Sequence, residues 1–398
     1  MDLTIFPGKL TGTVDAIPSK SQAHRYLICA AFADAPTELI CQQTNQDIEA
    51  TASCLRSLGA QIERTSRGFH ITPVDVLPEA CVLNCGESGS TLRFLLPVVG
   101  ALGVCAVFHM EGRLSQRPLS PLWEEMERMG CHLHWTSENT LSLSGRLTPG
   151  EYGIDGAVSS QFISGLLLAA GLMEGETVIR IRGKLESAPY VAMTIQAMSL
   201  FGVNTPNLHV SGTGRFHTPE FVITEGDWSN AAFFLAANIL GSDVDVVGLR
   251  FDSIQGDRAI SGLIPAIQER VSIACQDIPD LVPILAVLAA ANKGAQFTGI
   301  RRLRMKESDR VASVIAMIES LGGRAEATED VLTVYGTGFT GGTVDSCNDH
   351  RIAMAAAIAA TVCKENVTIL GADAVAKSYP QFWEDYRNLG GNYEQHIR

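Results

Sequence analysis

The sequence predicts an α/β protein of two domains in which helices cover sheets. Its 398 residues exceed what one ordinary hydrophobic core accommodates. An apolar helix with a polar first turn recurs, and successive starts are separated by 69, 70, 69, 51 and 69 residues. Six copies of a unit of roughly 65 residues account for nearly the whole chain and divide into two groups of three. The starts are Ser21, Ser90, Ser160, Ser229, Asp280 and Asp349.

A second series of helices shows the same period. Each member ends in an apolar residue followed by glycine, and strand-like alternation comes next. Each copy should therefore contain a polar-headed helix, a strand, an amphipathic helix and a pair of strands. The gap from Gly202 to Gly322 leaves room for one degenerate copy near Gln268. The endings are Leu58-Gly59, Met129-Gly130, Phe201-Gly202, Leu321-Gly322 and Leu389-Gly390.

The first copy predicts the order of elements in the later ones. Alternating apolar residues indicate strands, and a longer apolar run behind a serine indicates a helix. The expected strands are Leu3 to Phe6, Gly12 to Ala16, Gln61 to Arg64 and Phe69 to Ile71, and the expected helices are Ser19 to Ala33 and Ile48 to Leu58. The segment Glu225-Gly226-Asp227, halfway through the repeats, is the expected hinge between the two triplets.

The helix expected from Val158 to Gly171 indicates the role of the polar first turns, which we call the polar heads of these helices. Ser159 and Ser160 suit a helix N-cap, and the Leu/Ala run behind them reads as buried. A helix N-terminus offers unpaired backbone N–H groups and the positive end of the dipole. This head should therefore hold an anion.

Composition excludes several classes of protein. A hydrophobic fraction of 46% and a charged fraction of 18% are those of a compact globular protein. The formal charge of −13 argues against a nucleic-acid-binding surface, although a few focused cations can still bind an anionic small molecule. The longest apolar stretch, Leu281 to Ala291, is shorter than a membrane span, and no signal peptide precedes Asp2.

Cysteine and histidine usage further limits the class of protein. The ten cysteines form no Cys-x-x-Cys pair and fall inside apolar helices, as in a reduced cytoplasmic protein. None of the nine histidines has metal-ligand spacing, so we expect no metal and no cofactor. We also expect a monomer that binds neither membrane nor nucleic acid.

The densest charged segment is Arg304 to Arg310. Lys306 and Arg310 are four residues apart and should share a helix face beside Glu307. A solvated helix surface is the alternative. Because the segment opens an apolar helix, its cations stand where the dipole disfavours them and need an anionic partner. The same argument applies to Asp349-His350-Arg351.

Two more polar segments resemble these heads, and two others carry single cations. Lys20 and Ser21 fall at a helix start with Arg25 one turn inward. In Glu87 to Arg93, Gly89 would let backbone approach a ligand closely, although a glycine between serines is often only a turn. Gln116-Arg117-Pro118 and Lys377-Ser378-Tyr379-Pro380 add cations in non-helical positions, suited to the rim of a cleft.

Together these motifs resemble the EPSP synthase (3-phosphoshikimate 1-carboxyvinyltransferase) family over essentially the whole chain. The resemblance implies the two-domain enolpyruvyl transferase fold, an inverse α/β barrel of six βαβαββ repeats with three per domain. It implies domains of residues 14–223 and of 1–13 with 224–398. The matching segments are Lys20-Ser21, Ser159-Ser160-Gln161, Lys306-Glu307-Ser308-Asp309-Arg310, Asp349-His350-Arg351 and Lys377.

The chain departs from the family pattern at three places. Ile17-Pro18-Ser19 stands where the family usually has a glycine before the serine of the first head. His24 occupies a position more often Asn or Ser. Phe94 follows Arg93 where some members have Pro, so the sequence does not predict how strongly the inhibitor glyphosate binds.

The resemblance implies transfer of the enolpyruvyl group of phosphoenolpyruvate to the 5-hydroxyl of shikimate 3-phosphate, in aromatic amino acid biosynthesis. The residues expected to bind shikimate 3-phosphate are Lys20, Ser21, Arg25, Ser159, Ser160, Gln161, Ser187, Tyr190, Asp280 and Lys306. Those expected to bind phosphoenolpyruvate are Lys20, Gly89, Arg117, Gln161, Arg310, Arg351 and Lys377. The site should be complete only when the two domains close on both anions.

The same resemblance assigns the chemistry. Asp280 is the expected base toward the acceptor hydroxyl and Glu307 the proton donor to the methylene carbon, with addition followed by elimination of phosphate. Lys20 and Lys377 should stabilise the departing phosphate. The alternative for Asp280 is a helix cap.

Two competing functions remain. The sister transferase that acts on UDP-N-acetylglucosamine generally uses a Cys in the loop before its Arg-Pro segment, and Met110 to Gln116 contains none. A non-catalytic solenoid would explain the repeat but not the cations and carboxylates at the helix starts.

Overall fold

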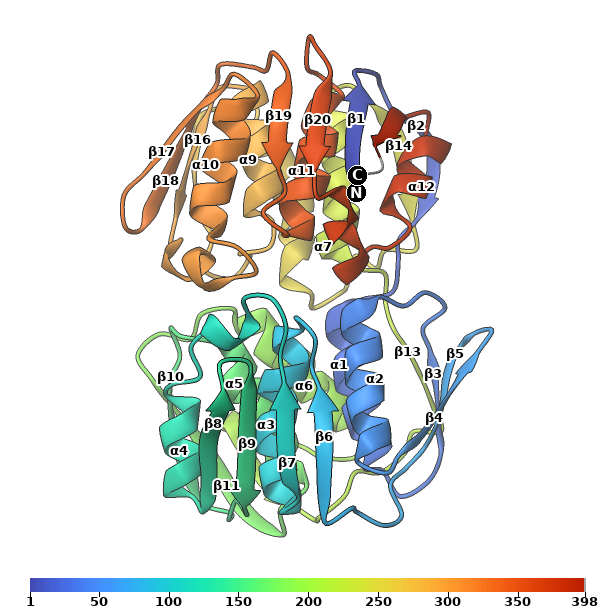
Figure 1. Ribbon diagram of the computed structural model, residues 1–398, viewed down its shortest axis with the longest axis vertical. Helices are drawn as coiled ribbons and strands as arrows, with labels where there is room; N and C mark the ends of the chain where they lie inside the picture. The colour runs from blue at the N-terminus through green and yellow to red at the C-terminus, as the bar shows by residue number, and fades with distance from the viewer. Residues whose placement is uncertain (397–398) are drawn as a thin grey trace. The chain divides into compact units, whose positions relative to one another are not determined.

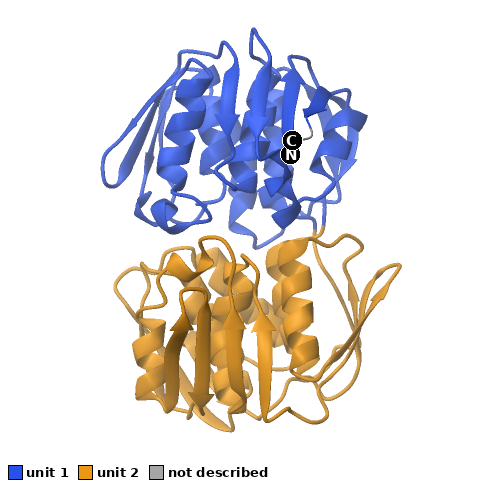
Figure 2. Cartoon of the chain, in the orientation of Figure 1, with its two compact units in different colours: residues 1–17, 226–398 blue, residues 18–225 orange. Residues whose placement is uncertain are grey.

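The chain folds into two compact units in this computed structural model, which describes residues 1–396. One unit consists of residues 1–17 and 226–398, and the other of the contiguous residues 18–225 (Figure 2). The divisions fall after Ile17 and Glu225, whereas the family resemblance implies divisions after residues 13 and 223. The difference at the first division arises because residues 11–15 form a strand that pairs within the first of these units.

The unit of residues 18–225 contains three sheets and six α-helices (Figure 1). Its helices are α1 (Lys20–Ala31), α2 (Gln46–Ser57), α3 (Gly89–Leu102), α4 (Leu122–Arg128), α5 (Ser160–Gly171) and α6 (Ala188–Leu200), with the 3₁₀ turns η1 (Leu114–Gln116) and η2 (Pro206–Leu208). Its strands are β3 (Thr37–Ile40), β4 (Gln61–Thr65), β5 (Gly68–Thr72), β6 (Ala80–Asn84), β7 (Cys105–His109), β8 (Cys131–Ser137), β9 (Thr140–Gly145), β10 (Glu151–Asp155), β11 (Gly175–Arg182), β12 (His209–Gly212) and β13 (Phe221–Ile223).

The unit of residues 1–17 and 226–398 also contains three sheets and six α-helices within its described part. Its helices are α7 (Trp228–Ile239), α8 (Ile260–Ala266), α9 (Val282–Ala291), α10 (Arg310–Ser320), α11 (His350–Ala360) and α12 (Phe382–Asn388), with η3 (Gly256–Ala259), η4 (Arg301–Met305) and η5 (Ala372–Lys377). Its strands are β1 (Asp2–Phe6), β2 (Thr11–Asp15), β14 (Asp243–Val247), β15 (Val271–Ala274), β16 (Ala295–Thr298), β17 (Arg324–Ala327), β18 (Val331–Tyr335), β19 (Gly342–Asp345), β20 (Val367–Leu370) and β21 (Asn392–His396).

All six sheets are small, and five of them mix parallel and antiparallel pairs. The sheet β6-β7-β9-β8 is typical, since β6 and β7 run parallel while β9 pairs antiparallel with both β7 and β8. The sheet β15-β16-β18-β17 repeats this pattern. The remaining sheets are β13-β3-β5-β4, β10-β11-β12, β19-β20-β1-β21 and the parallel pair β14-β2.

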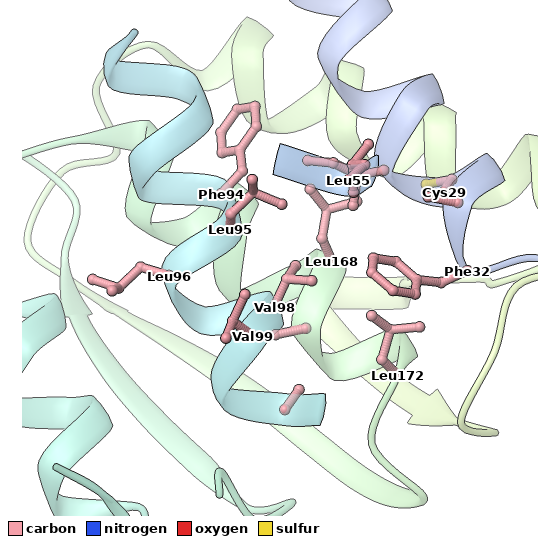
Figure 3. Packing of buried hydrophobic residues seen from close by; sticks show 14 of the residues in the cluster. Cys29, Phe32, Leu55, Phe94, Leu95, Leu96, Val98, Val99, Leu168 and Leu172 are labelled. Carbon is pink, nitrogen blue, oxygen red and sulfur yellow. The ribbon is translucent and has the colours of Figure 1, made fainter. Parts of the chain in front are cut away.

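Each unit has its own hydrophobic core, centred on the polar-headed helices. Helices α3 and α5 pack closely because Gly165 has no side chain, and a Cβ there would lie 2.3 Å from the carbonyl oxygen of Arg93. Figure 3 shows apolar side chains of both helices with those of α1 and α2. The labelled residues are Cys29, Phe32, Leu55, Phe94, Leu95, Leu96, Val98, Val99, Leu168 and Leu172.

A fully buried Leu such as Leu168 stabilises the fold enough that its replacement by Ala should cost about 2–5 kcal/mol. In residues 1–396 no helix is both long and apolar enough to span a membrane.

Candidate active site

In residues 18–225 the starts of α3 and α5 lie side by side. The amide nitrogen of Gln161 donates to Ser90 Oγ at 3.0 Å, and its amide oxygen accepts from Arg93 Nη1 at 2.9 Å. Ser159 is the N-cap of α5, as the sequence predicts, and accepts from the Gln161 backbone N–H at 3.3 Å. Ser160 is the first residue of α5 and is buried.

Arg25 is a buried cation surrounded by neutral groups. Its guanidinium donates to Thr194 Oγ1 at 2.7 Å and to the carbonyl oxygens of Ser21 and Tyr190 at 2.6 and 2.8 Å. It also reaches Ser164 Oγ at 3.3 Å, and within residues 1–396 it has no carboxylate partner. Burial lowers the pKa of Arg25 to about 10. An uncompensated buried charge of this kind favours a nearby anion.

Two further cations lie at helix starts of the same unit. Lys20, the first residue of α1, pairs with Asp47 through Nζ and Oδ2 at 2.7 Å. Arg117 packs against Gly89, where an added Cβ would lie 2.7 Å from Nη1 of the guanidinium. Glycine at this position therefore allows Arg117 to approach the start of α3.

The start of α6 carries Ser187 and Tyr190. Ser187 is the buried N-cap residue and has a left-handed backbone with φ of +56°. A non-glycine residue in this conformation costs about 1–3 kcal/mol, and such strain concentrates at functional sites. Tyr190 lies in the first turn, where its carbonyl oxygen binds Arg25.

In the other unit, Arg310 binds three carboxylates. Its Nε donates to Asp349 Oδ2 at 2.8 Å, its Nη1 to Asp280 Oδ1 at 2.6 Å, and its Nη2 to Glu307 Oε2 at 2.7 Å. Burial alone would lower the pKa of Arg310, but the three carboxylates outweigh it and hold the pKa well above its usual value. The anionic partners expected for this cation are thus provided by the protein itself.

Asp280 is held by cations on several sides. Arg351 Nη2 lies 3.0 Å from Asp280 Oδ2, and Lys306 Nζ lies 3.6 Å from Oδ1. Burial alone would raise the pKa of Asp280, but Arg351, Lys306 and Arg310 hold it well below the usual value. Burial lowers the pKa of Lys306 to about 8.

Lys377 belongs to the same unit and is buried. Its Nζ donates to the carbonyl oxygen of Asn348 at 2.7 Å, in the turn that precedes α11. Cys347 and Asn348 both adopt left-handed backbone conformations, with φ of +52° and +54°. Asp349 then caps α11 and accepts from the Arg351 backbone N–H at 3.0 Å.

The structure corrects two local expectations and disfavours the alternative role considered for Asp280. Lys306 and Glu307 do not share a helix face with Arg310, because Asp309 is the N-cap and α10 begins only at Arg310. Asp280 does not cap α9, whose N-cap position is Leu281. Lys377 ends the 3₁₀ helix η5 instead of standing in a loop, since residues 372–377 form a helical turn behind Gly371.

Sequence reasoning missed several partners of the site residues. It did not identify Asp47 as the partner of Lys20, nor Ser164 and Thr194 as the shell around Arg25. Asp47 carries a weak signal, since it stands in the acidic first turn of a helix capped by Asn45. In residues 1–396 no cluster of three or more His, Cys, Asp or Glu side chains could hold a metal ion.

The fold belongs to the enolpyruvyl transferase class. The solved enolpyruvyl transferase NikO from Streptomyces tendae has the same fold, with a TM-score of 0.78 over 100% of this chain and 99% of that chain at 19% identity. The structure of EPSP synthase from Acinetobacter baumannii aligns with a TM-score of 0.79 over 99% of this chain and 100% of that one, at 25% identity.

Sequence comparison gives the family within this class. The model of the family EPSP synthase (3-phosphoshikimate 1-carboxyvinyltransferase) matches residues 6–272 and 263–386, and the chain belongs to this family. The 3-phosphoshikimate 1-carboxyvinyltransferase of Clostridium kluyveri is 36% identical over 99% of this chain and 98% of its own length. That of Clostridium acetobutylicum is 37% identical over 98% of both. The chain is accordingly an enolpyruvyl transferase of the shikimate pathway, acting on phosphoenolpyruvate and shikimate 3-phosphate.

Proposed function

We propose that the two sets of side chains serve one reaction with divided roles. The set in residues 18–225 holds the phosphate of the acceptor, shikimate 3-phosphate, and part of the donor phosphate, and the set around Arg310 binds the donor carboxylate, contacts the acceptor hydroxyls and moves the protons. The observation that carries this division is the contrast between Arg25, a buried cation in a neutral shell, and Arg310, which is bound by three carboxylates. The positive charge of Arg25 is not compensated by a carboxylate, so it can bind an anion of the acceptor. The Arg310 cluster already contains the acidic groups that proton transfer needs.

The acceptor site uses the polar helix starts. Two helix N-termini and the buried cation Arg25 can hold a dianion with charge-assisted hydrogen bonds. Gln161 and Tyr190 lie near its ring, and Lys306 and Asp280 near its hydroxyls. The acceptor-binding residues are Lys20, Ser21, Arg25, Ser159, Ser160, Gln161, Ser187, Tyr190, Asp280 and Lys306.

The donor site uses planar guanidinium groups. Arg310 and Arg351 take the carboxylate of phosphoenolpyruvate, while Arg117, Lys20 and Lys377 take its phosphate. Gly89 supports this assignment, because the guanidinium of Arg117 lies against it at the start of α3. Gln161, beside Ser90, completes the donor-binding set.

Donor binding activates the base. Arg310 and Arg351 hold the pKa of Asp280 low, so the carboxylate is a weak base as it stands. A donor carboxylate that draws these two guanidinium groups toward itself weakens their hold on Asp280. Its pKa then rises, and Asp280 accepts the proton of the acceptor's 5-hydroxyl as the oxygen bonds to C2 of the donor.

Glu307 supplies the other proton. Donor carboxylate binding at Arg310 weakens the pairing of this guanidinium with the Glu307 carboxylate, which then takes up a proton from solvent. The resulting carboxyl, next to Arg310 Nη2, protonates the donor's methylene carbon and gives a tetrahedral intermediate. Elimination reverses this transfer, as the Glu307 carboxylate removes a proton from the new methyl group, the C–O bond to phosphate breaks and the enol ether forms. Asp280 passes the proton of the acceptor hydroxyl to the departing phosphate, and Lys20 and Lys377 balance the charge on that phosphate.

The chain organisation that we propose is six βαβαββ repeats, three in each of two domains, which form an inverse α/β barrel. The runs β6-α3-β7-α4-β8-β9 and β15-α9-β16-α10-β17-β18 support it, because both follow this order. We further propose a monomeric cytoplasmic enzyme, in keeping with ten cysteines that are all free.

The decisive assay measures phosphate release from phosphoenolpyruvate. Release should require shikimate 3-phosphate and should not occur with UDP-N-acetylglucosamine as the acceptor. Arg25→Met and Glu307→Gln test the division of roles, because the first should raise the Michaelis constant for the acceptor and the second should lower turnover. Release with the nucleotide sugar alone would contradict the proposal.

A further inference from the structure

Asp257 is a buried carboxyl group that the proposed reaction does not use. It lies in η3 with 2% of its surface exposed. Its Oδ2 accepts a hydrogen bond from Ser229 Oγ, while its Oδ1 is buried and has no hydrogen-bond partner in residues 1–396. A buried carboxylate oxygen without a donor is costly, so this arrangement needs a reason.

Ser229 joins Asp257 to the proposed donor site. Its side chain binds Asp257, and its carbonyl oxygen accepts from Arg351 Nη1 at 3.5 Å. The same nitrogen lies 3.4 Å from the carbonyl oxygen of Asp280, whose Oδ2 binds Arg351 Nη2 at 3.0 Å. Asp257 thus stands one residue away from the guanidinium that we assign to the donor carboxylate.

The charges around Asp257 are mostly negative. Asp280 before α9 and Asp227 at the start of α7 act on it as like charges, and Arg351 of α11 is the opposing cation. Burial, followed by Asp280, raises the pKa of Asp257 to about 7, against the attraction of Arg351. On its own element, Arg258 binds the carbonyl oxygen of Phe251. The carboxyl therefore changes charge near neutral pH in the free enzyme.

We propose that Asp257 is a positioning residue for Arg351, and that its carboxyl takes up a proton when the donor's carboxylate binds this arginine. The inference rests on the proposed donor role of Arg351. A second negative charge at Arg351 offsets the attraction that favours ionised Asp257, so protonation and donor binding promote each other. Ionised Asp257 instead competes with the donor for the positive potential of Arg351.

The sign of the pH effect follows from this linkage. Donor capture is strongest below the pKa of Asp257 and weakens as the pH rises through it. For each pH unit by which donor binding raises the pKa of Asp257, donor capture at high pH is about tenfold weaker than at low pH. Asp257→Asn mimics the protonated carboxyl and can still accept from Ser229, so the variant should escape the loss.

The test compares kcat/KM for phosphoenolpyruvate at saturating shikimate 3-phosphate between pH 6 and 9. Wild type and Asp257→Asn should agree within about twofold at pH 6, and the variant should be about tenfold faster at pH 8.5. A merely structural role would make the variant worse or equal at every pH. A constant ratio of the two enzymes across the range would overturn the proposal.

Two controls separate the possible causes. Asp252→Asn removes the same charge from an exposed, Arg250-paired carboxylate in the preceding loop and should keep the wild-type profile. His350→Gln removes the imidazole next to Arg351 and keeps that position polar. If His350→Gln abolished the pH step and Asp257→Asn did not, the proton would belong to His350 and the assignment to Asp257 would be wrong.

A stability measurement tests the carboxyl independently of turnover. A pKa raised above its unfolded value contributes stability that is lost as the pH rises from about 4 to about 7. The melting temperature of Asp257→Asn relative to wild type should therefore increase over this interval and then level off. A wild-type enzyme without phosphate release would refute the proposed function, whereas a flat difference in melting temperature would refute the titration of Asp257.

Discussion

Replacing Asp280 by Asn removes one negative charge while preserving the shape of the side chain. In the structure this carboxylate contacts Arg310 at 2.6 Å, Arg351 at 3.0 Å and Lys306 at 3.6 Å. Asn cannot accept the proton of the acceptor hydroxyl. Loss of a positioned general base typically lowers the rate by about 10²- to 10⁴-fold, which corresponds to about 3–5 kcal/mol in the activation barrier.

The same change should also destabilise the fold. Breaking a buried ion pair from one side costs about 3–5 kcal/mol. Arg310 keeps Glu307 and Asp349, and the Asn oxygen can still accept one hydrogen bond, so the lower end of that range applies. Urea denaturation should therefore show a loss of about 3 kcal/mol, which leaves a folded enzyme whose turnover can be measured.

The assay is single-turnover formation of product from both substrates, with acceptor binding measured separately by calorimetry. Asp309→Asn is the matched control, because Asp309 is the N-cap of α10 and Asn caps nearly as well. It should retain near wild-type turnover. If Asp280→Asn turned over at more than a tenth of the wild-type rate while binding the acceptor normally, Asp280 would not be the base.

Four further outcomes follow from the two sets of side chains. Arg25→Met should raise the Michaelis constant for shikimate 3-phosphate by at least about tenfold in steady-state kinetics, because a charge-assisted contact is lost, and an unchanged constant would contradict its assignment. Arg117→Lys should weaken phosphoenolpyruvate binding in calorimetry by about tenfold, since a point charge does not reproduce the planar fork, and equal affinity would count against it. Turnover should fall above a pH of about 8 as Lys306 loses its proton, and Lys306→Arg should shift that fall upward if the charge matters. Small-angle scattering should show a smaller radius of gyration with both ligands bound than with neither, and identical values would contradict domain closure.

The helix starts could be predicted from the sequence because they depend on local chemistry. Ser159 caps α5 as expected, and the apolar runs behind the heads are buried. The predicted helix boundaries were wrong where the capping residue was not identified from the sequence. Asp309, and not an earlier residue, caps α10 by accepting from the Ala312 backbone N–H, so the residues between η4 and Asp309 are not helical.

The pairing of charges could not be predicted in the same way. The three carboxylates on Arg310 come from residues 3, 30 and 39 positions away, and only the fold brings them together. The sequence around Asp257 did not indicate a functional residue, because the role that we propose for it depends on its burial and its neighbours and not on its residue type. Sequence spacing identifies candidate cations, whereas their electrostatic balance is a property of the packed structure.

The position of β1 has a consequence for biosynthesis. This strand lies inside the sheet β19-β20-β1-β21, where Leu3 pairs with Ile369 and Gln395 (Figure 1). At the usual rate of about 5–20 residues per second, the ribosome needs on the order of 20–80 s after making β1 to supply both of its partners. Within that time residues 18–225 are completed and can fold, while Leu3 and Ile5 still lack their partner strands. The emerging chain thus carries an unpaired, aggregation-prone strand throughout its synthesis, and a chaperone that shields the first few residues would raise the yield of native enzyme.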